Sequence, residues 1–95
     1  MPAIEKVYSQ IVSFAKGYGA TEVILFGSRA RGDNLPKSDI DIAVRGCQNI
    51  MQLYFDLQDD LDSLLDIDLV DLDSCHSSEL LSDIARDGIV LYEKV

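Results

Sequence analysis

The chain has 95 residues, of which 47% are hydrophobic, and a formal net charge of −9 at pH 7. This length predicts one domain, spanning residues 1–95, with one small hydrophobic core. The acidic balance excludes an extended nucleic-acid footprint, which would need a basic face, and favours a basic protein partner.

Hydropathy and cysteine usage narrow the class of protein further. No apolar stretch approaches the ~18 residues of a membrane span, and the N-terminus lacks the basic-then-apolar pattern of a signal peptide. We therefore expect a cytoplasmic protein without a membrane segment. The two cysteines, Cys47 and Cys75, lack the Cys-x-x-Cys spacing typical of zinc sites, so we interpret them as incidental thiols.

The first predicted element is an amphipathic helix over residues 3–18, which ends near Gly17 and Gly19. Its apolar side chains recur at helical spacing: Ile4, Val7, Tyr8, Ile11, Val12, Ala15 and Tyr18.

The apolar run 23–26 predicts a buried strand that ends in a turn at Gly27. Glycine there lets a phosphate approach the backbone closely, and the Ser28 hydroxyl can donate a hydrogen bond to a phosphate oxygen. Residues 28–32 begin a short helix whose free N–H groups favour an anion. The pattern predicts a phosphate-binding turn.

Three cationic residues follow this turn: Arg29, Arg31 and Lys37. One interpretation is that they neutralise a triphosphate or contact a partner, which makes Arg29 a candidate for the nucleotide-binding set. The other is that they form salt bridges with Asp33 and other surface acids. The sequence leaves both open.

Residues 38–44 alternate polar and apolar side chains, which predicts a strand with Asp39 and Asp41 on the face opposite to its apolar side chains. Two carboxylates about 7 Å apart repel by roughly 2 kcal/mol at an effective dielectric of about 20. A divalent cation reverses that penalty. Mg²⁺ is the natural candidate because it prefers one or two protein carboxylates together with substrate phosphates and water.

Apolar spacing predicts a second helix over residues 49–65, whose acidic outer side is a solvated face. The strand that follows carries Asp66 and Asp68 on one face, and either can complete an aspartate triad; Asp71 has the opposite parity and is a structural candidate. Three aspartates can hold two cations, one polarising the attacking oxygen and one neutralising a triphosphate.

The last predicted elements are a helix capped by Ser77 or Ser78 and stopped by Gly88, and a strand over residues 89–92. His76, just before the cap, is interpreted as incidental. The resulting order, α-β-(short α)-β-α-β-α-β, predicts an α/β (α+β) fold with a small mixed β-sheet and helices packed on one face.

Three segments together resemble the minimal nucleotidyltransferases, the MNT branch of the DNA polymerase β-like superfamily: Gly27-Ser28-Arg29-Ala30-Arg31-Gly32, Ser38-Asp39-Ile40-Asp41 and Ile67-Asp68-Leu69-Val70-Asp71-Leu72. The resemblance covers nearly the whole chain, because residues 87–93 also look like the terminal strand of that family.

The resemblance implies a polymerase β-like core, ATP as substrate and Mg²⁺ as cofactor. It implies Gly27 and Ser28 as triphosphate contacts, Asp39 and Asp41 as metal ligands, and Asp68 as the third acidic residue. MNT proteins are antitoxins paired with HEPN-domain ribonuclease toxins, and some transfer AMP from ATP to a tyrosine of the toxin. A HEPN partner, and with it a hetero-oligomer, is therefore what the resemblance predicts.

Two rival functions remain at the level of sequence. One is an antitoxin that neutralises its toxin by covering it. The other is the catalytic subunit of a small-molecule nucleotidyltransferase, such as one that modifies an antibiotic, with an acceptor domain on a second polypeptide. The neighbouring gene distinguishes them, because a HEPN protein there supports either toxin hypothesis and a non-toxic acceptor-binding subunit supports the last.

Overall fold

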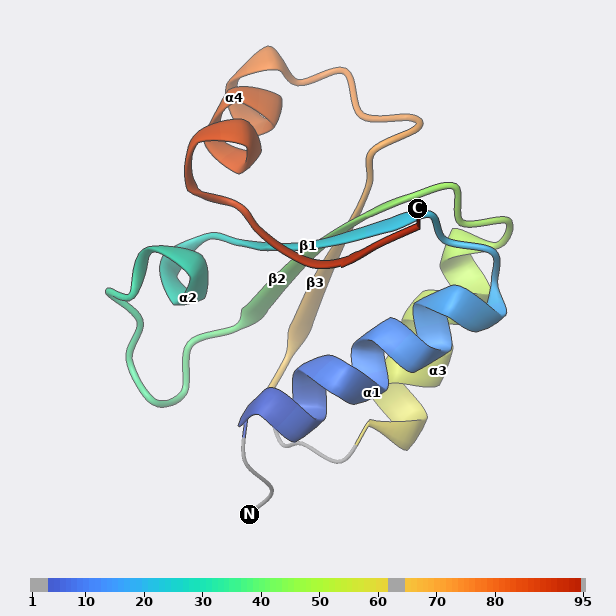
Figure 1. Cartoon of the computed structure of the whole chain (residues 1–95). Helices are drawn as coiled ribbons and strands as arrows, with labels where there is room; N and C mark the ends of the chain where they lie inside the picture. The colour runs from blue at the N-terminus through green and yellow to red at the C-terminus, as the bar shows by residue number, and fades with distance from the viewer. Residues whose placement is uncertain (1–3, 62–64, 95) are drawn as a thin grey trace.

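The computed structural model describes residues 4–61 and 65–94, so the predictions for residues 3 and 62–64 lie outside it. Its four strands form one mixed sheet in the order β3-β2-β1-β4, in which β2 and β3 are parallel and the other pairs are antiparallel (Figure 1). The elements are α1 (Ile4–Gly17), β1 (Glu22–Phe26), α2 (Ser28–Arg31), β2 (Ile40–Arg45), α3 (Ile50–Asp60), β3 (Ile67–Asp71), α4 (Ser78–Asp87) and β4 (Ile89–Glu93).

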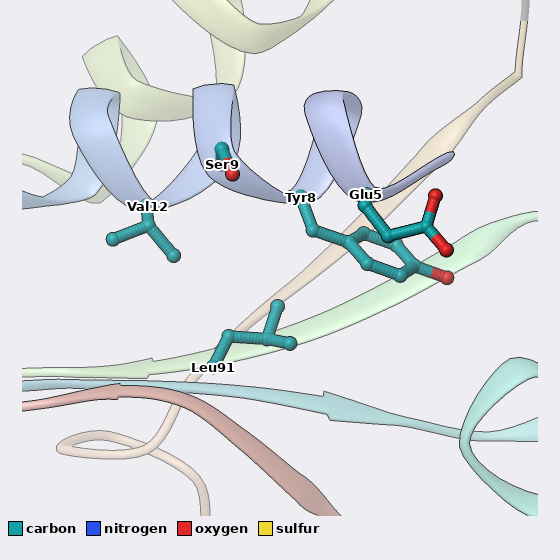
Figure 2. A pocket seen from close by; sticks show the side chains of 5 residues that line it. All are labelled: Glu5, Tyr8, Ser9, Val12 and Leu91. Atoms are coloured by element: carbon teal, nitrogen blue, oxygen red, sulfur yellow. The ribbon is translucent and has the colours of Figure 1, made fainter. Parts of the chain in front are cut away.

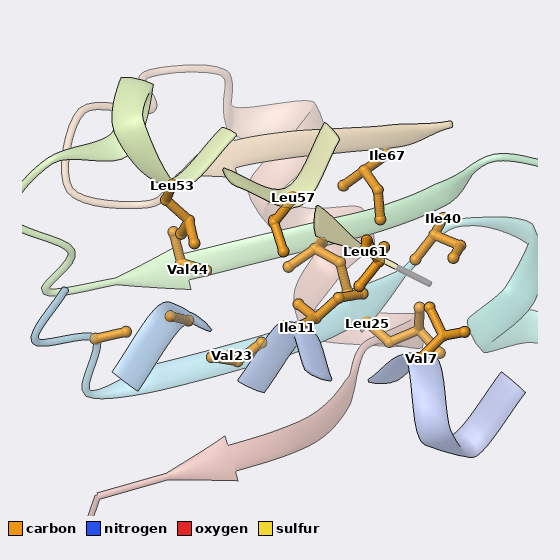
Figure 3. Close-up of a cluster of buried hydrophobic side chains, with 13 residues drawn as sticks. Val7, Ile11, Val23, Leu25, Ile40, Val44, Leu53, Leu57, Leu61 and Ile67 are labelled. Carbon is orange, nitrogen blue, oxygen red and sulfur yellow. The ribbon is translucent and has the colours of Figure 1, made fainter. Parts of the chain in front are cut away.

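The main core lies between the sheet and the pair α1 and α3, as the two amphipathic patterns predict (Figure 3). Val23 and Leu25 of β1 face it, together with the apolar side chains that alternate with the acidic ones along β2. The Tyr18 hydroxyl, just after α1, donates to the Asp56 carboxylate of α3 and ties the two helices together. Val7, Ile11, Ile40, Ile42, Val44, Leu53 and Leu57 are almost completely buried here.

Helix α4 lies on the opposite face of the sheet, so the prediction that the helices pack on one face was wrong for this element (Figure 1). Ile84 of α4 packs there against Ile24 and Phe26 of β1. The physical reason is that all four residues of the run 23–26 are apolar, so the second face of β1 also needs cover. The mixed sheet itself is confirmed.

Capping residues set where the later helices begin and end. Asn49 accepts a hydrogen bond from the Gln52 amide and caps α3, which stops at Asp60 because Leu61 is extended. That end is earlier than predicted. For α4, the choice left open by the sequence falls on Ser77, whose side chain accepts from the Leu80 amide, and Gly88 ends the helix as expected.

No helix among the described residues is long and apolar enough to cross a membrane. A pocket of about 360 Å³ lies between α1 and β4, with Val12 and Leu91 forming its apolar part and Glu5, Tyr8 and Ser9 its polar part (Figure 2). None of the predicted site residues lines this pocket.

Candidate active site

Gly27 joins the predicted phosphate-binding turn to the predicted metal site. It follows β1, and the last residue of β1, Phe26, is paired in register with Asp41 of β2. Gly27 has φ +74°, and a Cβ atom built on it would lie 2.1 Å from Oδ2 of Asp41. The backbone of the turn therefore lies directly against the Asp41 carboxylate, in a conformation that favours glycine. After it, α2 begins at Ser28, as the sequence predicts.

Asp68 is the second carboxylate that lies against Asp41. The parallel pairing of β2 and β3 sets Asp41 level with Asp68, and their side chains share a hydrogen bond. Asp66 lies just before β3, where its carbonyl oxygen accepts a hydrogen bond from the Ile40 amide at 2.9 Å. The alternating pattern placed Asp66 and Asp68 on the same face, and the strand register shows that Asp68 is the one level with Asp41.

The electrostatics of this pair are those of carboxylates held together against their repulsion. Partial burial, the hydrogen bond to Asp68 and the negative charges of Asp68 and Asp39 raise the pKa of Asp41 to about 6, against a small opposing effect of Arg31. Asp41 is half-buried, whereas Asp39 and Asp68 are exposed. A positive charge placed here would stabilise the ionised form of all three.

Asp39 lies just outside β2, which begins at Ile40 and not at residue 38 as the alternating pattern predicts. Its backbone is held through its neighbours: the Ile40 amide bonds to Asp66, and the Ser38 carbonyl accepts from Nε of Arg29 at 3.0 Å. The negative charge of Asp39 acts on Asp41, so the two residues of the motif are brought together.

The three cations after the turn differ in what they contact. Arg29 donates to two backbone carbonyls, those of Ser38 and Pro36. Arg31 forms an exposed salt bridge with Asp33 at 3.2 Å, which is the second interpretation that the sequence left open. Its positive charge also acts on Asp41. Lys37 is exposed.

Several residues singled out by sequence lie outside the acidic cluster. Asp71 accepts hydrogen bonds from the Asp73 amide and the Ser74 hydroxyl and so shapes the turn after β3, in keeping with the structural role suggested by its parity. Cys47 and Cys75 are free thiols, and His76 is exposed. Sequence reasoning missed Asp87 at the end of α4, whose carboxylate interacts with Arg31 as well as Arg86.

The donor set fits a divalent cation that is shared with a nucleotide. Within residues 4–61 and 65–94, no group of three or more His, Cys, Asp or Glu side chains converges closely enough to hold a metal ion alone. Mg²⁺ does not need such a group, since one or two carboxylates suffice when phosphates and water fill the remaining positions. Asp41, with a raised pKa beside a second carboxylate, has the chemistry of such a ligand.

Comparisons with known proteins identify the family of this chain. The model of the family "Polymerase beta, Nucleotidyltransferase" matches residues 9–95. No curated protein matches the chain.

Solved structures of three similar proteins are informative. A toxin–antitoxin crystal structure with AMP-PNP matches at 29% identity and a TM-score of 0.75, over 92% of this chain and 73% of that one. A tri-AMPylated Shewanella oneidensis HEPN toxin in complex with MNT antitoxin matches at 26% identity and a TM-score of 0.70, over 95% and 72%. A Sulfolobus solfataricus protein that is described as a nucleotidyltransferase matches at 27% identity and a TM-score of 0.56, over 90% of this chain and 77% of that one. The fold, the turn beside the acidic pair and the family match together show that this chain belongs to the polymerase β-type nucleotidyltransferase family, in the MNT group that its motifs resemble.

Proposed function

We propose that this protein is a Mg²⁺-dependent nucleotidyltransferase that moves AMP from ATP to a hydroxyl, most simply a tyrosine, of a partner HEPN toxin, and thereby acts as its antitoxin. The observation that carries the proposal is that Gly27 lies against the Asp41 carboxylate. This contact would let the proposed phosphate-binding turn and the proposed metal ligands act on one nucleotide. Nucleotidyl transfer needs both parts together.

In the proposed reaction, Gly27 and Ser28 hold the β- and γ-phosphates. Asp39 and Asp41 would hold Mg²⁺, with Asp68 beside them; two bound ions would neutralise the triphosphate and polarise the attacking oxygen. Asp68 also orients the acceptor hydroxyl and accepts its proton. The hydroxyl oxygen bonds to the α-phosphorus, the bond from that phosphorus to the bridging oxygen breaks, and pyrophosphate leaves.

The acceptor assignment is supported by the structural relatives and by charge. One relative is an antitoxin bound to an AMPylated HEPN toxin, and another toxin–antitoxin structure contains AMP-PNP. The net charge of −9 favours association with a basic protein, giving a hetero-oligomer. We place the reaction in the cytoplasm, where ATP and Mg²⁺ are abundant.

The direct test is the intact mass of the protein encoded by the neighbouring gene, measured after incubation with this protein, ATP and Mg²⁺. The proposal predicts one or more added nucleotide monophosphates, located on a hydroxyl side chain by peptide mass spectrometry. An ATP analogue with a methylene bridge between the α- and β-phosphates is the matched control, since it can bind but cannot release AMP. A partner of unchanged mass in the ATP reaction would contradict the proposal.

A further inference from the structure

The second half of the loop that connects α2 to β2, residues 32–39, is bonded to the Arg29 side chain of α2. The guanidinium of Arg29 donates from Nε to the Ser38 carbonyl at 3.0 Å and from Nη2 to the Pro36 carbonyl at 3.2 Å. Within the loop, the Ser38 hydroxyl accepts from the Leu35 amide at 2.8 Å, so the segment that Arg29 holds is itself closed into a turn. A planar fork with several donors suits two carbonyls that lie side by side.

The hydrogen bonds from Arg29 affect the position of Asp39, because Asp39 directly follows Ser38 in the chain. Asp39 is exposed and lies outside β2, so no strand pairing of its own fixes it. Its backbone is set by its two neighbours: Ile40, which is bonded to Asp66, and Ser38, which is bonded to Arg29. We propose that Arg29 is a positioning residue, which holds the connecting loop so that the Asp39 carboxylate is presented to the cation site beside Asp41.

The inference rests on the proposed function, and it gives Arg29 a different role from the direct triphosphate contact for which the sequence made it a candidate. The Arg29 guanidinium instead donates hydrogen bonds to the loop. Arg31 of the same helix forms an exposed salt bridge with Asp33, and its positive charge acts on Asp41. The two arginines of one short helix thus have separate roles.

The two roles predict opposite signs for metal binding. Removing a positive charge near a cation site strengthens cation binding by Coulomb's law. A positioning residue behaves differently, since its loss displaces a ligand, and outer contacts of this kind are worth about 10- to 100-fold in metal affinity. Weaker binding after loss of an arginine is therefore a signature that charge alone cannot produce.

The experiment titrates the whole protein with Mn²⁺ alone, counts free Mn²⁺ by electron paramagnetic resonance, and compares Arg29→Ala, Arg29→Lys and Arg31→Ala with the wild type. We expect Arg29→Ala to bind Mn²⁺ roughly tenfold more weakly or worse. Arg29→Lys keeps the charge but not the fork, so it should also weaken binding, and Arg31→Ala should bind as tightly as the wild type or more tightly. Metal-free ATP affinity should be unchanged in Arg29→Lys within about twofold, because the positive charge is kept and no phosphate contact is lost.

Equal or tighter Mn²⁺ binding by a folded Arg29→Ala would overturn the inference, as would a large loss of metal-free ATP affinity in Arg29→Lys. If Arg29→Ala fails to fold, Arg29→Lys decides alone, because unchanged Mn²⁺ binding in that variant also overturns it. Asp41→Asn separates this from the proposed function: if the wild type shows no Mn²⁺ site that depends on Asp41, the metal assignment itself has failed.

Discussion

At the scale of single residues, the account depends on how closely the turn backbone lies against Asp41. The atom that a Cβ on Gly27 would meet first is the end of the Asp41 side chain, not a backbone atom. Substitution there therefore displaces the carboxylate before it breaks the fold. Gly32 offers the matched control, since it has φ +84° and open space around its missing Cβ.

We predict that Gly27→Ala and Gly32→Ala lose similar stability, about 1–2 kcal/mol, from placing an L side chain at positive φ. Only Gly27→Ala should lose Mg²⁺-dependent ATP binding, because only its methyl group displaces the Asp41 carboxylate. Urea unfolding and calorimetry of the two variants check both halves. Normal Mg²⁺-ATP binding by folded Gly27→Ala would place the phosphate site elsewhere.

A second prediction at this scale concerns the raised pKa of Asp41, which is about 6 in the folded chain against the ordinary value of 3.8 for an aspartate. Because the folded pKa lies above the unfolded one, metal-free protein loses stability as pH rises from about 4 to about 6, and stays at the lower value above that. Asp41→Asn removes this loss and keeps a hydrogen bond to Asp68. After allowing for solvent screening of a half-exposed group, the gain at pH 8 is of the order of 1 kcal/mol.

Denaturant unfolding in chelator at pH 4 and pH 8 measures this effect. The variant should exceed the wild type at pH 8 and match it at pH 4. A stability difference that is the same at both pH values would show that burial and the neighbouring carboxylates do not raise the pKa of Asp41 as described.

At the scale of the elements, hydrophobic periodicity, apolar runs and turn residues together predicted the helices and strands, but they did not predict which face of the sheet each helix covers. Leu80, Leu81 and Ile84 mark α4 as amphipathic without saying which face of the sheet it covers; the available sign was the run 23–26, which is apolar on both faces of β1. Strand β2 begins two residues later than predicted, because the polar–apolar alternation continues at Ser38 and Asp39, outside the paired residues.

The candidate site also contains residues that the sequence pattern predicts and residues that only long-range contacts identify. Gly27 and Asp41 belong to one short motif, and the antiparallel pairing of two consecutive strands, β1 and β2, brings them together. Choosing Asp68 over Asp66 needs the register of two strands separated by a helix, which is set by long-range pairing. The partners of Arg29 are backbone carbonyls of a loop, and no side-chain pattern encodes them.

An element-scale prediction tests the cap of α4. The Ser77 side chain accepts a hydrogen bond from the Leu80 amide at 3.3 Å, whereas Ser78 is the first residue of the helix. Ser77→Ala should lower the free energy of unfolding by about 1 kcal/mol, and Ser78→Ala should change it by a few tenths at most. Equal losses in urea titrations of the two variants would contradict the assignment of the cap.

At the scale of the whole molecule, charge is the dominant surface property. Seventeen acidic residues against eight lysines and arginines give the net charge of −9. A field of this sign repels nucleic acid and steers a basic partner toward the surface. The same surplus makes a cation at the acidic site more favourable.

We therefore predict that association with the proposed partner toxin is electrostatically steered. The association rate constant, measured by stopped flow, should fall roughly tenfold or more between low and high salt, while the dissociation rate constant changes little. An association rate that is independent of salt would show that the acidic surface has no part in recognition.

The central claim is that neutralisation of the toxin is a chemical transfer that uses the acidic pair. The most direct measurement combines growth of cells producing the toxin with the intact mass of that toxin, for the wild type and for Asp39→Ala/Asp41→Ala at equal expression. The account predicts growth and an added nucleotide monophosphate with the wild type, and neither with the double variant, although the variant still co-purifies with the toxin. Full growth with the double variant and an unmodified toxin would contradict it, because binding alone would then suffice for protection.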